Sequence, residues 1–312
     1  MKALGFSTPG GPEVLEVLDL PDPSPGPGEL RIRVHAAAVN PTDLARREGM
    51  GTSGPKAPAP PHVPGMDAAG VLAEIGPETQ TALSVGDEVM AVVVPTGIRG
   101  AYAEQIVVPA ESVVRAPAHA SRAEASTLPM NGLTAQLALD TLRLAPGSAV
   151  AVTGAAGAMG GYTVQLAKLA GLQVVADAAE TDEALVAELG ADLVLPRGSG
   201  FAERIREHFP QGVEAAVDAA MLHEELVPAI QDEGEIITLR GYQGTGDRGV
   251  RFTPVLVGKY ARAQQKLDAL RRSAEAGEVT LRVADTLPKE EAAEAHRRLA
   301  AGGVRGRLVL EF

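Results

Sequence analysis

The stretch SAVAVTGAAGAMGGYTVQLAKLAG, residues 148–171, contains the clearest structural pattern of this chain. A short apolar run, AVAVTG (149–154), predicts a buried strand, and GGYTVQLAKLAG (160–171) predicts a helix that ends at Gly171. Between them lies a Gly/Ala-rich turn, which is either a phosphate cradle or only a tight turn. Because such turns are common, the rest of the chain must decide between the two interpretations.

Strands and helices alternate on both sides of this stretch. Further strands are expected at QVVADA (173–178), ADLVLP (191–196), VEAAVDAA (213–220) and GEIITLRG (234–241). Helices are expected at 121–142, at TDEALVAELG (181–190) and at FAERIREHF (201–209). This alternation is typical of an α/β domain with a parallel sheet.

The first 117 residues have a different pattern, with short Val-containing runs between Gly and Pro. They predict a mostly β domain, and the last residues return to short β patterns in LRVAD (281–285) and GRLVLEF (306–312). We therefore expect two domains, one formed by 1–117 and 278–312 and the other by 118–277.

Composition excludes several classes of function. The chain of 312 residues has a formal net charge of −12 and no basic run, which argues against binding to nucleic acid. It has no cysteine, so disulfides, thiolate nucleophiles and Cys-ligated metals are impossible. No stretch resembles a membrane span, and the start, MKALGFSTPGG, lacks the apolar region of a signal peptide. We expect a cytoplasmic protein that does not interact with membranes.

In this context the turn AAGAMG (155–160) matches the dinucleotide fingerprint GxGxxG, with Ala155 at the first glycine position. A glycine at 157 would let the backbone approach a pyrophosphate, and a glycine at 160 would let the helix pack closely on the strand. The acid expected at the end of the second strand of such folds is here Asp177. The predicted cofactor contacts in this region are Ala156, Gly157, Ala158, Met159, Gly160 and Asp177.

Short motifs in order along nearly the whole chain also carry a family resemblance. They are AAAVNPTD (36–43), PGMDAAGVLAEIG (64–76), VGDEVMAV (85–92), GAYAEQIVVP (100–109), LPMNGLTAQLAL (128–139), VTGAAGAMGGYTVQLAK (152–168), AELGADLVL (187–195) and GGVRGRLVL (302–310). In this order and spacing they resemble the zinc-independent quinone oxidoreductase branch of the medium-chain dehydrogenase/reductase family.

The resemblance implies a GroES-like, mostly β catalytic domain joined to a Rossmann domain with a doubly wound parallel sheet. The active site would lie between the two, and hydride would pass from a reduced nicotinamide to a quinone or another activated carbonyl. The zinc branch of the family uses a Cys and a G-H-E motif. Here the latter motif is Gly65-Met66-Asp67 and Cys is absent, so no zinc is expected.

The resemblance also implies roles for single residues. Asn40 is the candidate catalytic residue, a polar group at the nicotinamide or at the substrate carbonyl, although it could equally be a turn residue before a proline. Asp43 is expected to cap the following helix rather than to act in catalysis. Thr134 would face the nicotinamide ribose, and Arg240 and Gly241 would lie near the nicotinamide.

The chain departs from the family five residues after Asn40, where relatives often have Tyr. This position is Ala45, followed by Arg46 and Arg47. The substrate pocket is then wider or more basic than usual, or the two arginines face solvent.

For the cofactor we favour NADPH, with Arg197 at the end of the third strand as the 2′-phosphate contact. The alternative is NADH with Asp177 on the ribose 2′-hydroxyl, because the segment 178–183 contains three acids and no Lys or Arg.

Two alternative functions remain open on the same scaffold. One is an enoyl reductase that acts on α,β-unsaturated carbonyls, and the other is a redox-sensing protein that binds the nucleotide without turnover. The small-molecule partner is accordingly a quinone or an enone. The resemblance also implies a homodimer that pairs through the edge strand of the Rossmann sheet, here near RFTPVLV (251–257), because such a strand has exposed backbone groups that need covering.

Overall fold

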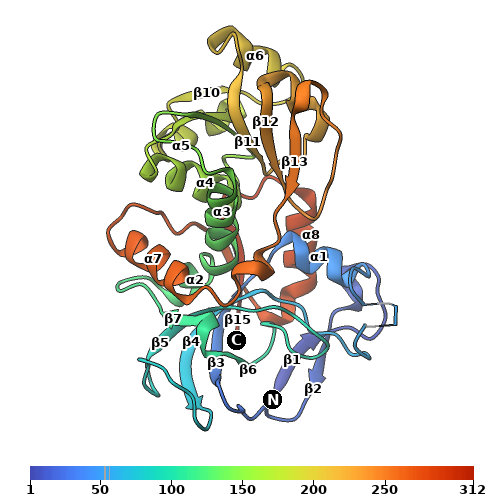
Figure 1. Ribbon diagram of the computed structural model, residues 1–312. Helices are drawn as coiled ribbons and strands as arrows, with labels where there is room; N and C mark the ends of the chain where they lie inside the picture. Colours follow the sequence, from blue (N-terminus) through green and yellow to red (C-terminus); the bar gives the residue numbers. More distant parts are fainter. Residues whose placement is uncertain (53, 56) are drawn as a thin grey trace. The chain divides into compact units, whose positions relative to one another are not determined.

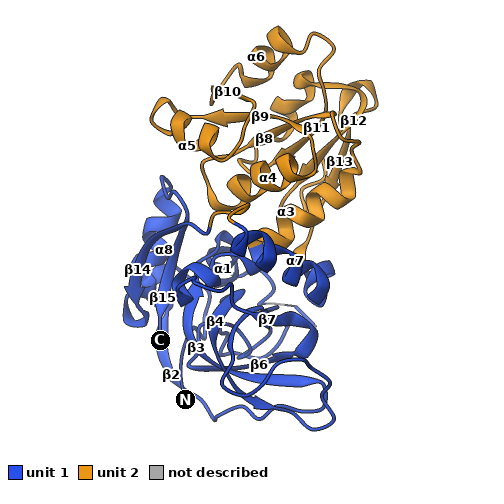
Figure 2. Cartoon of the chain, turned by 90° about the vertical axis from the view of Figure 1, so that its left-hand side faces the viewer, with its two compact units in different colours: residues 1–130, 258–276, 281–312 blue, residues 131–257, 277–280 orange. Residues whose placement is uncertain are grey.

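The computed structural model describes residues 1–52, 54–55 and 57–312, which form two compact units (Figures 1 and 2). The first unit contains 1–130, 258–276 and 281–312, and the second contains 131–257 and 277–280. Each has its own core, built mainly from Val, Leu, Ile and Ala side chains. The predicted α/β fold with a mostly β part is confirmed.

The second unit is built on a six-stranded sheet in the order β10-β9-β8-β11-β12-β13, in which every pairing is parallel. Its strands are β8 (Ala149–Thr153), β9 (Gln173–Ala178), β10 (Leu193–Pro196), β11 (Val213–Asp218), β12 (Ile230–Thr238) and β13 (Arg251–Pro254). The predicted first strand of this region, β8, is central and buried along its whole length. Its position explains why AVAVT is apolar without alternation, since both of its faces are covered.

Four helices accompany this sheet: α3 (Pro129–Leu142), α4 (Ala158–Leu169), α5 (Glu183–Glu188) and α6 (Phe201–His208). They lie where the sequence predicts helices, and α4 packs on β8 and β9. In the described part of the chain no helix is long and apolar enough to span a bilayer.

The first unit contains a largely antiparallel sheet in the order β14-β15-β3-β4-β5-β7, with β6 paired to β3, and a separate β1-β2 pair. The strands are β1 (Lys2–Gly5), β2 (Glu16–Asp19), β3 (Glu29–Ala38), β4 (Asp67–Ile75), β5 (Glu88–Val92), β6 (Gln105–Pro109), β7 (Val113–Arg115), β14 (Val283–Pro288) and β15 (Arg307–Glu311). Its helices are α1 (Pro41–Arg47), α2 (Arg122–Ser126), α7 (Gln264–Glu275) and α8 (Ala292–Ala301).

The boundaries of the two compact units differ from the predicted domain boundaries. Helix α7 belongs to the first unit, because the Gln264 amide donates to the carbonyls of Ala110 and Val113. The Ser112 hydroxyl also donates to the Ala261 carbonyl at 2.6 Å. These are contacts between distant segments, which helix and strand periodicity does not reveal.

Candidate functional site

The glycine-rich turn joins β8 to α4 as the sequence predicts. Gly157 is the N-cap of α4, and the first intrahelical bond runs from the Gly161 N–H to the Gly157 carbonyl at 3.0 Å. Intrahelical bonding therefore has no acceptor for the N–H groups of the first turn, Ala158 to Gly160. Together with the helix dipole, these groups make the start of α4 suited to an anion such as a phosphate.

Two glycines of this turn are required by its geometry. A Cβ at Gly160 would lie 2.3 Å from the Gly154 carbonyl oxygen, so only glycine lets the helix approach the turn this closely. Gly154 has φ +64°, in the left-handed region that disfavours other residues. The conformational role that the fingerprint gives to its first glycine thus falls on Gly154 rather than on Ala155.

Asp177 lies at the end of β9, directly beside this turn. Its carboxylate accepts the Ala155 N–H at 3.2 Å, and the side chain is buried, with 4% of its surface exposed. Burial raises its pKa. The acid therefore holds the turn in place, whether or not it also meets a ribose.

Arg197 follows β10 directly and is exposed. Its N–H donates to the Ala178 carbonyl at 2.8 Å, which extends the pairing of β10 with β9. Its charge lowers the pKa of Asp177, against the stronger effect of burial. The two residues on which the NADPH and NADH interpretations depend thus lie at the same edge of the sheet.

Arg240 and Gly241 follow the end of β12, and both are exposed with left-handed backbones of φ +55° and +79°. Thr134 lies in α3 and is buried, with 7% exposed. Within the second unit, the structure therefore brings the turn before α4, Asp177, Arg197 and Arg240 to the carboxyl ends of neighbouring parallel strands. That edge is the place where open α/β sheets bind their ligands.

Sequence reasoning missed a polar pair at the same edge. The Thr153 hydroxyl, at the end of β8, donates to the Asp218 carboxylate at the end of β11, at 2.8 Å, and it accepts the Ala220 N–H. Asp218 also accepts the N–H groups of Leu222 and His223. The sequence did contain a signal for this pair, because Thr153 and Asp218 are polar residues at the ends of apolar strands.

The first unit gathers a cluster of buried polar side chains around Asn40. Asn40 is the N-cap of α1, is fully buried, and donates its amide to Asp67 at 2.7 Å and to the Ala38 carbonyl at 3.3 Å. Asp67 in turn accepts the Met130 N–H at 2.5 Å. Both N–H bonds of the Asn40 amide are thus used within the protein.

Asp43 lies in the first turn of α1 rather than at its N-cap. Its carboxylate accepts the N–H groups of Asn40 and Gly65 at 2.8 Å and the Tyr102 hydroxyl at 3.3 Å. It stabilises the start of the helix by closing a capping box with Asn40. The capping role expected for Asp43 is therefore shared between the two residues.

A chain of hydrogen bonds continues from Asp43 to α8. Arg47 contacts Nδ1 of His296 at 3.4 Å, and Nε2 of His296 contacts the Tyr102 hydroxyl at 3.2 Å. Because arginine only donates, Nδ1 accepts and the proton of the neutral imidazole is on Nε2. The Tyr102 hydroxyl then donates to Asp43, so every bond in the chain points toward this carboxylate.

Burial dominates the titration of this cluster. It raises the pKa of Asp67 to about 7 and that of Asp43 to about 6, while it lowers the pKa of His296 to about 3. It also raises the pKa of Tyr102. All four side chains therefore favour their neutral forms more than the same groups do in water.

The two arginines after Ala45 do not both face solvent. Arg47 is buried, with 3% exposed, and donates to the Gly10 carbonyl and to Glu48. Arg46 is half-buried, and burial lowers its pKa. The interpretation that both arginines are solvent-facing is wrong for Arg47, since it closes the hydrogen-bond chain to His296.

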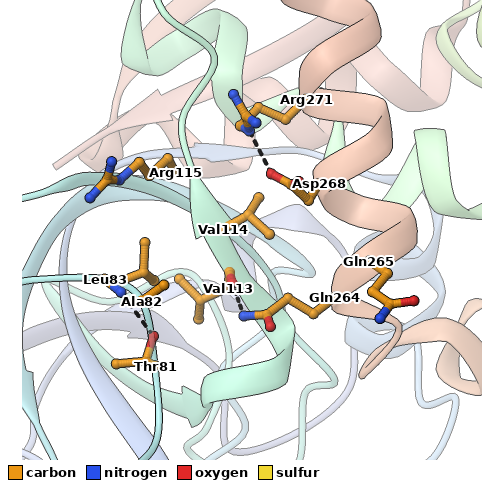
Figure 3. A pocket seen from close by; sticks show the side chains of 10 residues that line it. All are labelled: Thr81, Ala82, Leu83, Val113, Val114, Arg115, Gln264, Gln265, Asp268 and Arg271. Atoms are coloured by element: carbon orange, nitrogen blue, oxygen red, sulfur yellow. Dashed lines mark hydrogen bonds and ion pairs between the residues drawn. The ribbon is translucent and has the colours of Figure 1, made fainter.

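No group of three or more His, Cys, Asp or Glu side chains with metal-binding geometry occurs among the described residues. A cavity of about 420 Å³ lies in the first unit between β7, residues 81–83 and α7, as Figure 3 shows. Its charged groups are already paired, Arg115 with Asp87 and Arg271 with Asp268. It includes none of the predicted site residues.

Residues 26–118 match the alcohol dehydrogenase GroES-like domain, and residues 189–310 match the zinc-binding dehydrogenase domain. The chain is 32% identical over 251 residues to an NADPH-dependent alkenal/one oxidoreductase of Arabidopsis thaliana, a match that covers 77% of this chain. The match spans 63% of that relative's length.

A chloroplast envelope quinone oxidoreductase homolog of Arabidopsis thaliana is 31% identical, with 77% of this chain and 74% of the relative covered. Among solved structures, an NAD-dependent alcohol dehydrogenase is 30% identical with a TM-score of 0.87, and both chains are fully covered. A mycobacterial protein solved with NADPH is 27% identical with the same TM-score and full coverage of both chains.

Proposed function

The chain belongs to the quinone oxidoreductase-like branch of the medium-chain dehydrogenase/reductase family, and from this premise we propose that it transfers hydride from a reduced nicotinamide dinucleotide to a quinone or a similar activated carbonyl. The observation that carries the proposal is the turn between β8 and α4. It combines a helix start suited to a phosphate with a glycine at 160, where a Cβ would lie 2.3 Å from the Gly154 carbonyl oxygen.

The residues of the second unit fit a dinucleotide. The N–H groups of Ala158 and Met159 would hold the pyrophosphate, with Ala156, Gly157 and Gly160 shaping the turn around it, since the Gly157 N–H already donates to the Gly154 carbonyl at 2.9 Å. Thr134, Arg240 and Gly241 would bind the nicotinamide half. The bound dinucleotide would supply the hydride, and the protein's task is to orient it and to exclude water.

We propose NADPH as the cofactor, with Arg197 as the contact to its 2′-phosphate. Two facts support this choice: Arg197 is exposed at the end of β10, whereas the Asp177 carboxylate is buried against the turn. Arg197→Ala should weaken NADPH binding about tenfold and leave NADH binding unchanged, because one charged hydrogen bond is lost.

Nicotinamide fluorescence during titration with NADPH and NADH measures both affinities. Arg143→Ala is the matched control, since Arg143 is an exposed arginine of the same unit. Equal binding of NADPH by the Arg197 variant would reject this contact, and tighter binding of NADH by the wild type would favour Asp177.

Asn40 is the proposed polar group near the reacting carbonyl. For a quinone, hydride addition leaves an anion that is readily protonated, so a strong acid is not required. The alternative is that Asn40 only caps α1, as its bonds to Asp67 and Ala38 allow. If Asn40 acts in catalysis, Asn40→Ala should lower kcat even at temperatures where the variant is fully folded. A lower thermal stability with unchanged kcat would support the capping role alone.

Reduction of an α,β-unsaturated carbonyl is the second candidate function, favoured by the relative named for alkenals and alkenones. Steady-state NADPH oxidation with a small quinone and with an enone, at equal concentrations, separates the two. Binding of NADPH without turnover on either acceptor would instead support a redox-sensing protein.

We further propose that the reaction needs no zinc and that the protein is a cytoplasmic homodimer. The chain has no cysteine, and β13 is an edge strand of the sheet with one side left for pairing. Unchanged activity in the presence of a chelator would support the absence of zinc. The mass from light scattering tests the homodimer, and cell fractionation tests the cytoplasmic location.

A further inference from the structure

Two neighbouring loops at the carboxyl edge of the second unit have strained backbones. Met221 and His223 follow β11 with φ +59° and +55°, and Arg240 follows β12 with φ +55°. Residues other than glycine rarely adopt this left-handed conformation, and they keep it only where surrounding contacts hold the backbone. Such residues often occur at functional sites, where contacts with neighbouring residues hold the backbone in place.

The loop after β11 is held by the buried Asp218. Its carboxylate accepts the N–H groups of Leu222 at 3.0 Å and His223 at 2.8 Å. The same carboxylate accepts the Thr153 hydroxyl, which ties this loop to the strand before the glycine-rich turn. The imidazole of His223 is thereby carried on a fixed backbone.

The loop after β12 is held by Tyr242. The His223 ring stacks on the Tyr242 ring, with centroids 3.7 Å apart and planes 18° apart. The Tyr242 hydroxyl donates to Glu224, and its carbonyl accepts the Thr238 hydroxyl at 2.7 Å. This arrangement, which we call the His223–Tyr242 clamp, joins the two loops side chain to side chain.

The clamp closes a turn that contains two predicted cofactor residues. The Tyr242 N–H contacts the Leu239 carbonyl at 3.3 Å, so Arg240 and Gly241 lie between two fixed points. Both have left-handed backbones. Glycine adopts this conformation readily but arginine does not, so Arg240 must be held there by its surroundings. A binding segment that is already ordered loses less entropy when its ligand arrives.

The order of strands in the sheet indicates which half of a dinucleotide would bind at this turn. In such sheets the ribose of the adenosine half lies at the strand after the glycine-rich turn, here β9, and the pyrophosphate lies at the start of the helix after β8. β11 and β12 are on the opposite side of β8 from β9. The nicotinamide half therefore extends over β11 and β12.

From these observations we infer that Tyr242 and His223 are positioning residues that hold the Arg240–Gly241 turn ready for the nicotinamide half of the cofactor. The inference rests on the proposed function, because it presupposes a dinucleotide. It concerns one half of that ligand only, and this makes it separable by experiment.

The test compares a whole cofactor with its adenosine half. Binding of NADPH and of 2′,5′-ADP is measured by calorimetry for the wild type, Tyr242→Ala, Tyr242→Phe and His223→Gln. We expect Tyr242→Ala and His223→Gln to weaken NADPH binding about tenfold and to leave 2′,5′-ADP binding within about twofold. Tyr242→Phe keeps the ring and should retain most of the NADPH affinity.

His208→Gln is the matched control for His223→Gln, because His208 is an exposed histidine of the same unit at the end of α6. It should change neither affinity. Unchanged binding of 2′,5′-ADP by the variants also reports that the unit is folded. If the wild type prefers NADH, NADH and ADP replace the two ligands.

An equal loss of both ligands would overturn the inference, since it would make the clamp a general structural element. Unchanged NADPH binding in both Tyr242→Ala and His223→Gln would overturn it as well, while leaving the proposed function intact. Failure of the wild type to bind either NADPH or NADH would overturn the proposed function and the inference with it.

Discussion

The polar residues of the two units are used in different ways. In the first unit, Asp43, Asp67, Tyr102 and His296 are buried and are bonded to one another, to Asn40 or to nearby backbone. At the strand ends of the second unit, Asp177 and Asp218 accept the N–H groups of the loops that would carry a ligand. The first arrangement stabilises the fold around Asn40, and the second fixes the loops at the edge where we propose that the dinucleotide binds.

This difference has a consequence for mutation. Loss of a group in the buried cluster should lower the free energy of unfolding and leave the nucleotide affinity of the folded protein unchanged. Loss of a group at the strand ends should change nucleotide affinity at a smaller cost in stability.

The largest effect is expected for Asp43→Ala. It leaves the N–H groups of Asn40 and Gly65 and the Tyr102 hydroxyl buried without their acceptor, which should cost about 3 kcal/mol or more. Urea unfolding measures the loss, and Asp19→Ala, an exposed aspartate of the same unit, is the control. A loss below about 1 kcal/mol would remove Asp43 from the centre of the cluster.

At the strand ends, Gly160→Ala should have its main effect on the ligand. The added Cβ would lie 2.3 Å from the Gly154 carbonyl, so the turn and α4 must separate, at about 1–3 kcal/mol. NADPH affinity should fall at least about tenfold, because the N–H groups of the turn shift. Gly258→Ala is the control, since nothing lies within 4 Å of its Cβ position. Normal NADPH binding by Gly160→Ala would break the contrast.

The buried cluster should also give stability a pH dependence with two opposite signs. Native Asp67 keeps its proton up to about pH 7, whereas the unfolded chain releases it near 3.8. The stability of the wild type relative to Asp67→Asn should therefore fall as pH rises from 4 to 7, by about 1.4 kcal/mol per pH unit at most.

His296 acts in the other direction. Its folded pKa is about 3, against 6.5 in the unfolded chain, so its contribution is present above pH 6.5 and is lost as pH falls toward 3. The stability of the wild type relative to His296→Gln should therefore rise as pH increases from about 3 to 6.5. Unfolding at several pH values measures both differences, and a flat difference for either variant would show that the group titrates normally.

The smallest effect is expected for Thr153→Val, which removes one hydroxyl between the ends of β8 and β11. It should cost about 1–2 kcal/mol, because the bond to Asp218 and the bond from the Ala220 N–H are both lost. The exposed Thr280→Val is the control. Loss of more than about 3 kcal/mol would place Thr153 with the buried cluster rather than with the strand ends.

The second unit could be predicted from sequence to a large extent. The run AVAVT, the turn AAGAMG and the helix after it appear as β8, the glycine-rich turn and α4, because their pattern depends on residues that are close in the chain. The edge position expected for residues 251–257 is occupied by β13. The left-handed role of Gly154 was missed, since the fingerprint counts it outside the motif.

The cluster of the first unit could not be predicted in this way. Its members come from residues 40–47, 67, 102 and 296, and nothing local in the sequence indicates that they meet. For the same reason the sequence left open whether Arg47 faces solvent, and only its contact with His296 decides that it is buried.

The class of fold and the strand–turn–helix unit with its glycines could be derived from the sequence, because they follow from periodicity and from spacing over a few residues. The family was indicated by the resemblance of short motifs in order along nearly the whole chain. Only the folded structure shows which acids are buried with raised pKa values, how Asn40 uses its amide, and that His223 and Tyr242 join two loops. Such features depend on contacts between residues far apart in the chain, and their physical consequences come from burial, which only the folded chain creates.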